Sequence, residues 1–156
     1  MEIRFTKLSD ERHAVTVVRR DGSTETVELE TRSFLRHDLA HLVAEGELGL
    51  AGGVWGSVAA GGSLSGEGLD GADMLAAESV AGPLQTLFRL DAEPAAIEEV
   101  LARTIGDVDT AVVAARIHER FRQLRGHWAA TPYGDDMVLE WGEPPAAGDG
   151  PAGRPR

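Results

Sequence analysis

The chain has 156 residues, a formal net charge of −11 and no cysteine. Its length fits one domain with a single hydrophobic core, and its negative charge argues against a general binder of nucleic acid or of anionic membranes. Because cysteine is absent, disulfides and thiolate metal sites are excluded, and any metal ion must be held by nitrogen and oxygen ligands.

Three strand-like segments open the chain, at residues 2–7, 14–19 and 24–30. Apolar and polar residues alternate in each of them, which is the pattern of a strand with one buried face. Asp21 and Gly22 are typical of a two-residue hairpin turn. The three segments therefore predict an antiparallel meander.

The segment that follows, 33–46, reads S-F-L-R-H-D-L-A-H-L-V-A-E-G and predicts an amphipathic helix. Ser33 is the expected N-cap, and Gly46 or Gly49 the expected end. One stripe of this helix should face the core, and it consists of Leu35, Leu39, Leu42 and Val43.

Two histidines and an aspartate lie beside that stripe. His37 and His41 are about 6 Å apart along a helix axis, so both imidazoles can bind one ion, as in zinc helices of the H-E-x-x-H type. Asp38 would then support the site or act as a general base. Glu45 lies about 12 Å from His37 along the axis, too far to complete the same coordination sphere. A third ligand must come from another segment.

Glu78 is the best candidate for this third ligand. It is the only charged residue between Met74 and Phe88, and a lone carboxylate in apolar surroundings is costly unless it is paired or bound to a cation. Two alternatives stay open for it: a partnership with an arginine or histidine, or simple exposure. Asp70 and Asp73 are weaker candidates because both resemble helix-start residues.

The histidines also have an interpretation without a metal. They point away from the leucine stripe and would then lie on a solvated helix face, with Asp38 and Glu45 as ordinary surface charges. Ala40 and Ala44 favour the metal site instead, because small residues beside the histidines would let another helix pack over them.

The H-D-x-x-H string at 37–41 resembles the zinc motif of the accessory proteins of ubiquinone biosynthesis, in which a glutamate follows further along the chain. Here the corresponding position falls at 52–54, which reads G-G-V and offers no ligand. The whole pattern, with its short N-terminal sheet, L-E-T-R-S-F-L-R-H-D-L-A-H, a Gly-Trp-Gly segment and a closing A-T-P-Y-G, also resembles an uncharacterised bacterial family. That second resemblance implies no activity.

The glycine-rich segment 48–66 has neither the Walker nor the dinucleotide-binding spacing. It predicts tight turns around Trp55 and a short helix at 53–60. A second helix should start at Asp70 or Asp73 and be kinked or broken at residues 82–83, which read Gly-Pro. A third should run from Pro94 to the stop at Gly106.

The last helix should be capped by Asp107 or Asp109 and carries four arginines. These are Arg116, Arg120, Arg122 and Arg125. They would bind an anionic ligand or an acidic partner, or pair with carboxylates of the same chain, and intramolecular pairing is the favoured interpretation. Alternating apolar residues at 137–141 predict a final strand at an edge of the meander, and the proline- and glycine-rich segment 143–156 predicts a disordered tail.

Together these elements predict an α+β fold in a single domain, 1–142: a small antiparallel four-stranded sheet, with three N-terminal strands and one C-terminal strand, covered by three to four helices. No N-terminal signal or convincing transmembrane segment is visible, so the expected location is the cytoplasm.

Two hypotheses for the function follow from the sequence. The first is a divalent-metal-binding protein, zinc-like in its ligands and hydrolase-like in its chemistry, with His37, His41 and Glu78 as ligands and Asp38 as the catalytic residue. The second is a non-catalytic interaction domain or homo-oligomer without a metal, which would bind through exposed apolar surface around Trp55 or Phe88.

Overall fold

The computed structural model describes residues 1–66, 71–106 and 109–142. The predicted roles of Asp70 and Asp107, and the predicted disordered tail 143–156, lie outside these ranges. Within them, no helix combines the length and the apolar character that crossing a bilayer would need.

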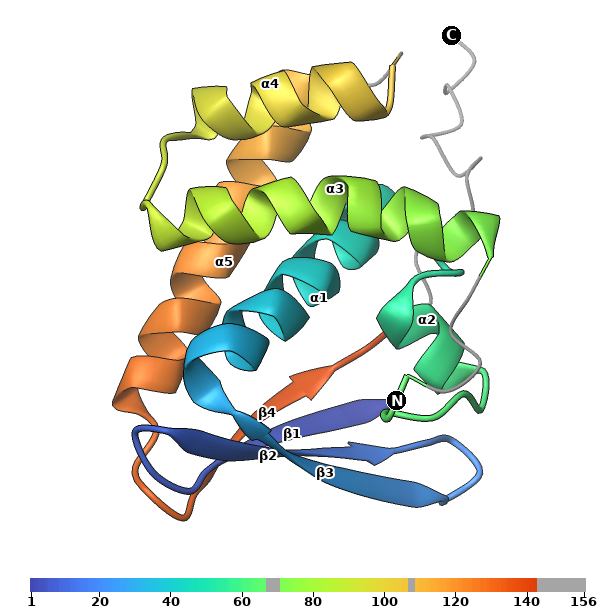
Figure 1. Ribbon diagram of the computed structural model, residues 1–156, viewed down its shortest axis with the longest axis vertical. Helices are drawn as coiled ribbons and strands as arrows, with labels where there is room; N and C mark the ends of the chain where they lie inside the picture. The colour runs from blue at the N-terminus through green and yellow to red at the C-terminus, as the bar shows by residue number, and fades with distance from the viewer. Residues whose placement is uncertain (67–70, 107–108, 143–156) are drawn as a thin grey trace, which may run out of the picture.

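The fold is α+β, as predicted, with one four-stranded antiparallel sheet on which the helices are stacked (Figure 1). The sheet order is β3-β2-β1-β4, so the C-terminal strand pairs with β1 at the free edge of the meander. Alternate side chains, among them Phe5 and Val15, are buried in the core. The strands are β1 (Glu2–Lys7), β2 (Arg12–Val18), β3 (Thr24–Glu30) and β4 (Asp136–Glu140).

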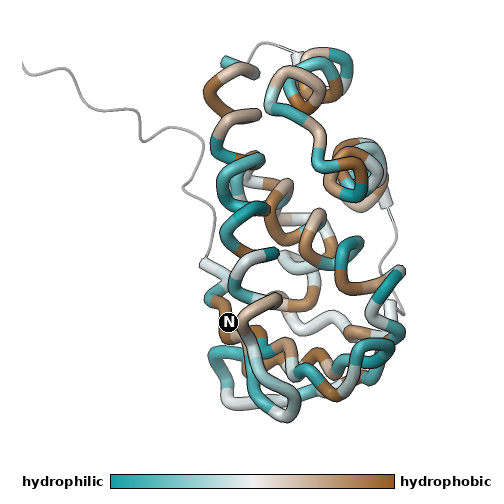
Figure 2. Tube along the Cα trace, turned by 90° about the vertical axis from the view of Figure 1, so that its left-hand side faces the viewer, coloured by the Kyte–Doolittle hydropathy of each residue, from teal (hydrophilic) through white to brown (hydrophobic). Residues whose placement is uncertain are grey.

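Five α-helices and one short π-helical segment are present in the described residues. They are η1 (Thr31–Leu35), α1 (Arg36–Leu48), α2 (Val54–Ala59), α3 (Ala72–Arg89), α4 (Pro94–Thr104) and α5 (Thr110–Ala130). Pro94 begins α4 and the Asp109 side chain caps α5, as predicted, the latter by accepting a hydrogen bond from the Val112 N–H at 3.3 Å. Figure 2, in which α3 and α4 are seen close to end-on, shows the helices layered above the sheet.

The start of the central helical segment differs from the prediction that Ser33 is its N-cap. The Glu30 side chain at the end of β3 instead accepts hydrogen bonds from the backbone N–H groups of Arg32 (2.9 Å) and Ser33 (2.8 Å). These bonds satisfy donors that a helix start leaves open, so the chain turns directly from strand to helix. The segment ends at Gly49, whose φ of 68° is the left-handed conformation that favours glycine.

Helix α1 is buried on nearly all sides because it lies between the sheet and α3 (Figure 1). Every residue at 39–45 is buried. Ala40 and Ala44 are fully buried, which agrees with the expectation that these small residues let another helix pack over them. The interpretation in which both histidines lie on a solvated face is therefore wrong for His41, which has no exposed surface.

Helix α3 is continuous from Ala72 to Arg89 with Pro83 inside it, so of the kink or break predicted at residues 82–83 the break is wrong. Pro83 lacks an N–H for the helical hydrogen bond, which costs about 3 kcal/mol in a helix interior. The helix nevertheless buries an apolar face that extends past the proline on both sides and includes Val80, Leu84 and Phe88. We attribute its continuity to this packing.

Candidate metal centre

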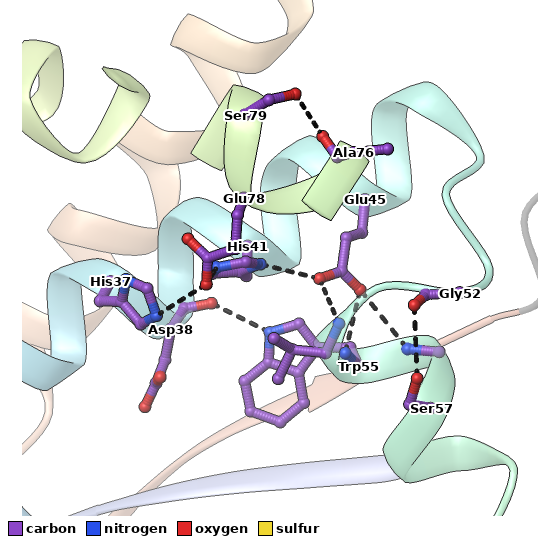
Figure 3. A network of polar contacts seen from close by, with 12 residues as sticks. His37, Asp38, His41, Glu45, Gly52, Trp55, Ser57, Ala76, Glu78 and Ser79 are labelled. Carbon is purple, nitrogen blue, oxygen red and sulfur yellow. Dashed lines mark hydrogen bonds and ion pairs between the residues drawn. The ribbon is translucent and has the colours of Figure 1, made fainter. Parts of the chain in front are cut away.

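Helices α1 and α3 bring together the three side chains that the sequence predicted as metal ligands (Figure 3). One ligand atom each from His37, His41 and Glu78 lie within 4.8 Å of one another. The Oε1 atom of Glu78 is 3.2 Å from Nε2 of His41 and 3.9 Å from Nε2 of His37. The two imidazoles are thus directed at the same carboxylate oxygen.

Glu45 holds the other side of the His41 ring. Its Oε1 atom accepts a hydrogen bond from Nδ1 of His41 at 2.9 Å, and neither side chain has any exposed surface. The same carboxylate accepts hydrogen bonds from the N–H groups of Val54 (2.7 Å) and Trp55 (2.9 Å) at the start of α2. It therefore caps α2, where the helix dipole favours a negative charge. The interpretation of Glu45 as a surface charge is wrong.

Gly53 makes this arrangement possible. A Cβ atom at that position would lie 2.3 Å from Cδ of Glu45, far inside van der Waals contact. Only glycine lets the carboxylate approach the first N–H groups of α2 so closely. In the sequence, the indications were a carboxylate four residues after His41 and a glycine pair before a short helix, but their contact follows from the tertiary fold.

His37 has a similar partner, which the sequence did not reveal. Its Nδ1 atom is hydrogen-bonded to Oε1 of Gln85 at 3.3 Å, and Nε2 of Gln85 donates to the backbone oxygen of Ser33 at 3.4 Å. Gln85 follows Glu78 by two helical turns, so both lie on the face of α3 that meets α1. Each imidazole therefore donates from Nδ1 to an acceptor and presents Nε2 to Glu78.

The charges around His41 favour its protonated form in the metal-free protein. Burial disfavours the imidazolium, but the hydrogen bond that His41 donates to Glu45 and the negative charges of Glu45 and Glu78 outweigh burial and raise the pKa of His41. A proton on Nε2 then lies between His41 and Glu78, where a cation would bind. The side chain of His37 is 32% exposed and that of Glu78 is 45% exposed, so the centre is open to solvent on one side.

The carboxylate of Asp38 points away from Glu78 (Figure 3). Together with His37 it lines a pocket of about 310 Å³ whose walls include Val27 and Trp55. Burial raises the pKa of Asp38 to about 7, although the positive charge of His41 acts in the opposite direction. The indole N–H of Trp55 donates to the backbone oxygen of Asp38 at 3.0 Å, which fixes this turn of α1.

Three side chains of this kind could hold a metal ion in an open site. Two imidazole nitrogens and one carboxylate oxygen suit zinc and similar divalent ions, and a set of three protein ligands leaves a fourth position for water or substrate. The described residues offer one such group, made by His37, His41 and Glu78.

The two aromatic residues around which the alternative hypothesis expects an exposed apolar surface are themselves buried. Trp55 is 1% and Phe88 6% exposed. Trp55 packs edge-on against Phe5, and Phe88 stacks on Phe121, so both aromatic rings belong to the core. Homo-oligomer formation itself stays a prediction.

Most arginines of α5 pair with carboxylates of the same chain, as favoured from the sequence. Arg116 contacts Glu47 at 2.9 Å and Arg122 contacts Glu119 at 2.9 Å. The ion pair of Arg125 is with Asp91, at 2.7 Å.

Comparison of the chain with protein-family models, with curated proteins and with solved structures gives no significant match. The resemblances to the ubiquinone-biosynthesis proteins and to an uncharacterised bacterial family therefore remain predictions.

Proposed function

We propose that the protein binds a divalent metal ion, zinc in the first instance, through His37, His41 and Glu78, and uses it in hydrolase-like chemistry. One observation carries this proposal: both Nε2 atoms face one oxygen of Glu78, while both Nδ1 atoms are held by acceptors. Metal-binding histidines commonly have such partners, which fix the tautomer and the ring orientation and make the ligand nitrogen more basic.

The charge balance supports the same proposal. With neutral imidazoles, the buried carboxylate of Glu45 and the half-exposed carboxylate of Glu78 place two negative charges beside His41. A divalent cation would compensate both of them, whereas a single proton on His41 compensates one. Binding of the metal would displace that proton, so the affinity should rise with pH.

The pocket beside His37 supports a catalytic use of the centre. A bound metal supplies a Lewis acid and lowers the pKa of a coordinated water. Asp38 contributes a carboxyl group with a pKa of about 7, which can accept or release a proton near neutral pH. Since its carboxylate lies in the pocket and not between the ligands, we propose that Asp38 transfers a proton to or from a substrate bound there.

Elemental analysis tests the metal site. The metal-free protein would be incubated with zinc, dialysed and analysed, with one zinc per chain as the expected result. The double variant His37→Ala, His41→Ala should retain almost none. A matched control replaces His118 and His127 of α5, which lie outside the ligand group, and should bind as the unaltered chain does. Equal zinc content in all three proteins would contradict the proposal.

The catalytic role of Asp38 needs a separate experiment. Zinc-loaded protein would be assayed with an activated ester such as 4-nitrophenyl acetate, with zinc-free protein as the background. Asp38→Asn should lower the rate at least about tenfold and leave the zinc content unchanged. An unchanged rate would remove Asp38 from the mechanism without affecting the metal site.

A further inference from the structure

A second pocket lies where the η1–α1 segment, the end of α3 and the middle of α5 meet. Its volume is about 340 Å³, and it shares none of its described lining residues with the metal centre or with the pocket of Asp38. Four of its ten described lining residues are arginines, and none is acidic: the arginines are Arg32, Arg36, Arg89 and Arg125. They come from three different segments, so the fold and not a local repeat gathers them.

The charges of these arginines are compensated unequally. Arg125 pairs with Asp91 at 2.7 Å, and Arg32 lies near Glu30, whose carboxylate caps the helical segment. In the described parts of the chain, neither Arg36 nor Arg89 makes an ion pair. The chain as a whole carries a net charge of −11, so the two unpaired arginines make this pocket a positively charged region of an otherwise acidic protein.

Apart from the four arginines and Thr31, the residues that line the pocket are aliphatic or aromatic. Phe88 and Phe121 stack at the side of the pocket, with 3.6 Å between their ring centroids, and Trp128 adds a partly exposed indole. An apolar concavity with a few polar groups at fixed positions is the usual form of a small-molecule site. Guanidinium groups bind carboxylate and phosphate oxygens in a planar, bidentate manner.

From this combination we infer that the pocket binds a small organic anion, with its oxyanion group held by Arg36 and Arg89 and its aromatic or acyl body against Phe121 and Trp128. Carboxylates and phosphate monoesters share this chemistry. The inference does not depend on the metal site, since the two sets of residues are separate.

Two fluorescent probes of nearly the same shape test the inference on the full chain. 1-Anilinonaphthalene-8-sulfonate carries an anionic group on an aromatic body, and N-phenyl-1-naphthylamine is the same body without the charge. We expect the anionic dye to bind at one saturable site, with an affinity that falls as salt is added. The double variant Arg36→Gln, Arg89→Gln should weaken its binding at least about tenfold and leave binding of the uncharged dye unchanged.

The control variant, Arg103→Gln, Arg120→Gln, has the same change in net charge outside the pocket and should bind both dyes as the unaltered chain does. Competition with phenyl phosphate and with benzoate would then identify the preferred anion, and at least one of them should displace the dye. Three results would overturn the inference. The anionic dye could bind both double variants with equal affinity, or the pocket variant could lose affinity for both dyes equally. The third is that neither phenyl phosphate nor benzoate displaces the dye. The variant His37→Ala, His41→Ala should bind the dye normally, so failure of the metal proposal can be recognised separately.

Discussion

Glu45 and His41 are hydrogen-bonded inside the protein, with 2.9 Å between Oε1 and Nδ1 and no exposed surface on either side chain. The same carboxylate caps α2 through the N–H groups of Val54 and Trp55. Glu45 thus both orients His41, a predicted metal ligand, and binds the first N–H groups of the neighbouring helix α2. Changes at Glu45 should therefore affect both metal affinity and stability.

Replacing Glu45 by glutamine should weaken zinc binding about 10- to 100-fold, the usual effect of losing the group that orients a metal-binding histidine. Glutamine keeps the size of the side chain but loses its charge and one of its acceptor oxygens. Zinc affinity would be measured by competition with a chromophoric chelator. The control is Glu47→Gln, on the same helix, where the carboxylate pairs with Arg116 and not with a histidine. Equal affinities for the two variants would contradict this role of Glu45.

Replacing Gly53 by alanine should destabilise the protein by about 1–3 kcal/mol, because the new Cβ overlaps the carboxylate of Glu45. Zinc affinity should fall as well, since Glu45 would move from His41. Urea unfolding measures the first effect. As a comparison, Gly126→Ala in α5 adds a methyl group that meets nothing within 4 Å, and it should stabilise the helix by about 0.5–1 kcal/mol. A Gly53→Ala protein as stable as the unaltered chain would argue against the close contact.

Removal of zinc should lower the thermal stability of the protein. A ligand at 100 times its dissociation constant stabilises the folded state by about 2.7 kcal/mol if the unfolded chain does not bind it. Thermal unfolding with zinc and with a chelator should show this difference for the unaltered chain and for Glu99→Gln, an exposed carboxylate on α4. In Glu78→Gln, most of this zinc-dependent stabilisation should be lost. A zinc-dependent shift of equal size in Glu78→Gln would show that the ion binds elsewhere.

His13 should make the protein sensitive to acid. It is fully buried, and Nε2 has no hydrogen-bond partner among the described residues. Burial lowers its pKa from 6.5 to about 4, although the charge of Glu30 acts in the opposite direction. Because the folded-state pKa lies below the unfolded value, the neutral ring contributes stability that is complete above pH 6.5 and is lost as the pH falls from 6.5 to about 4.

The loss amounts to about 3 kcal/mol, from a shift of 2.5 pKa units at 1.36 kcal/mol each. Comparison with His13→Phe in urea unfolding at several pH values isolates this contribution, because other titrating groups are common to both proteins. The stability difference between them should change by that amount between pH 6.5 and 4. A difference independent of pH would contradict the buried, neutral state of His13, as would an imidazole that titrates near pH 6.5 by NMR.

Much of the fold and part of the site could be predicted because they depend on local patterns. Alternation gave the strands, and the helical spacing of His37 and His41 placed both rings on one side of a helix. Glu78 stood out because a single carboxylate in an apolar run needs a partner. The structure brings these three side chains together.

The remaining features depend on contacts between segments distant in the sequence. Gln85 contacts His37 only because α3 packs against α1. Glu45 is an i,i+4 neighbour of His41 on α1, but its role as the acceptor for the first N–H groups of α2 depends on how α2 packs against α1. In the same way, Glu30 replaces Ser33 as the cap because β3 leads into the helix without a loop. The continuity of α3 through Pro83 reflects burial of its apolar face, which local propensity does not include.

The most direct test of the metal site is crystallographic. Crystals of the zinc-loaded protein would be measured at the zinc absorption edge, and an anomalous difference map would locate the ion. We predict one strong peak at about 2.0–2.2 Å from Nε2 of His37, Nε2 of His41 and a carboxylate oxygen of Glu78. A map without a peak between these three side chains, or with its main peak at His118 or His127, would contradict the proposed function.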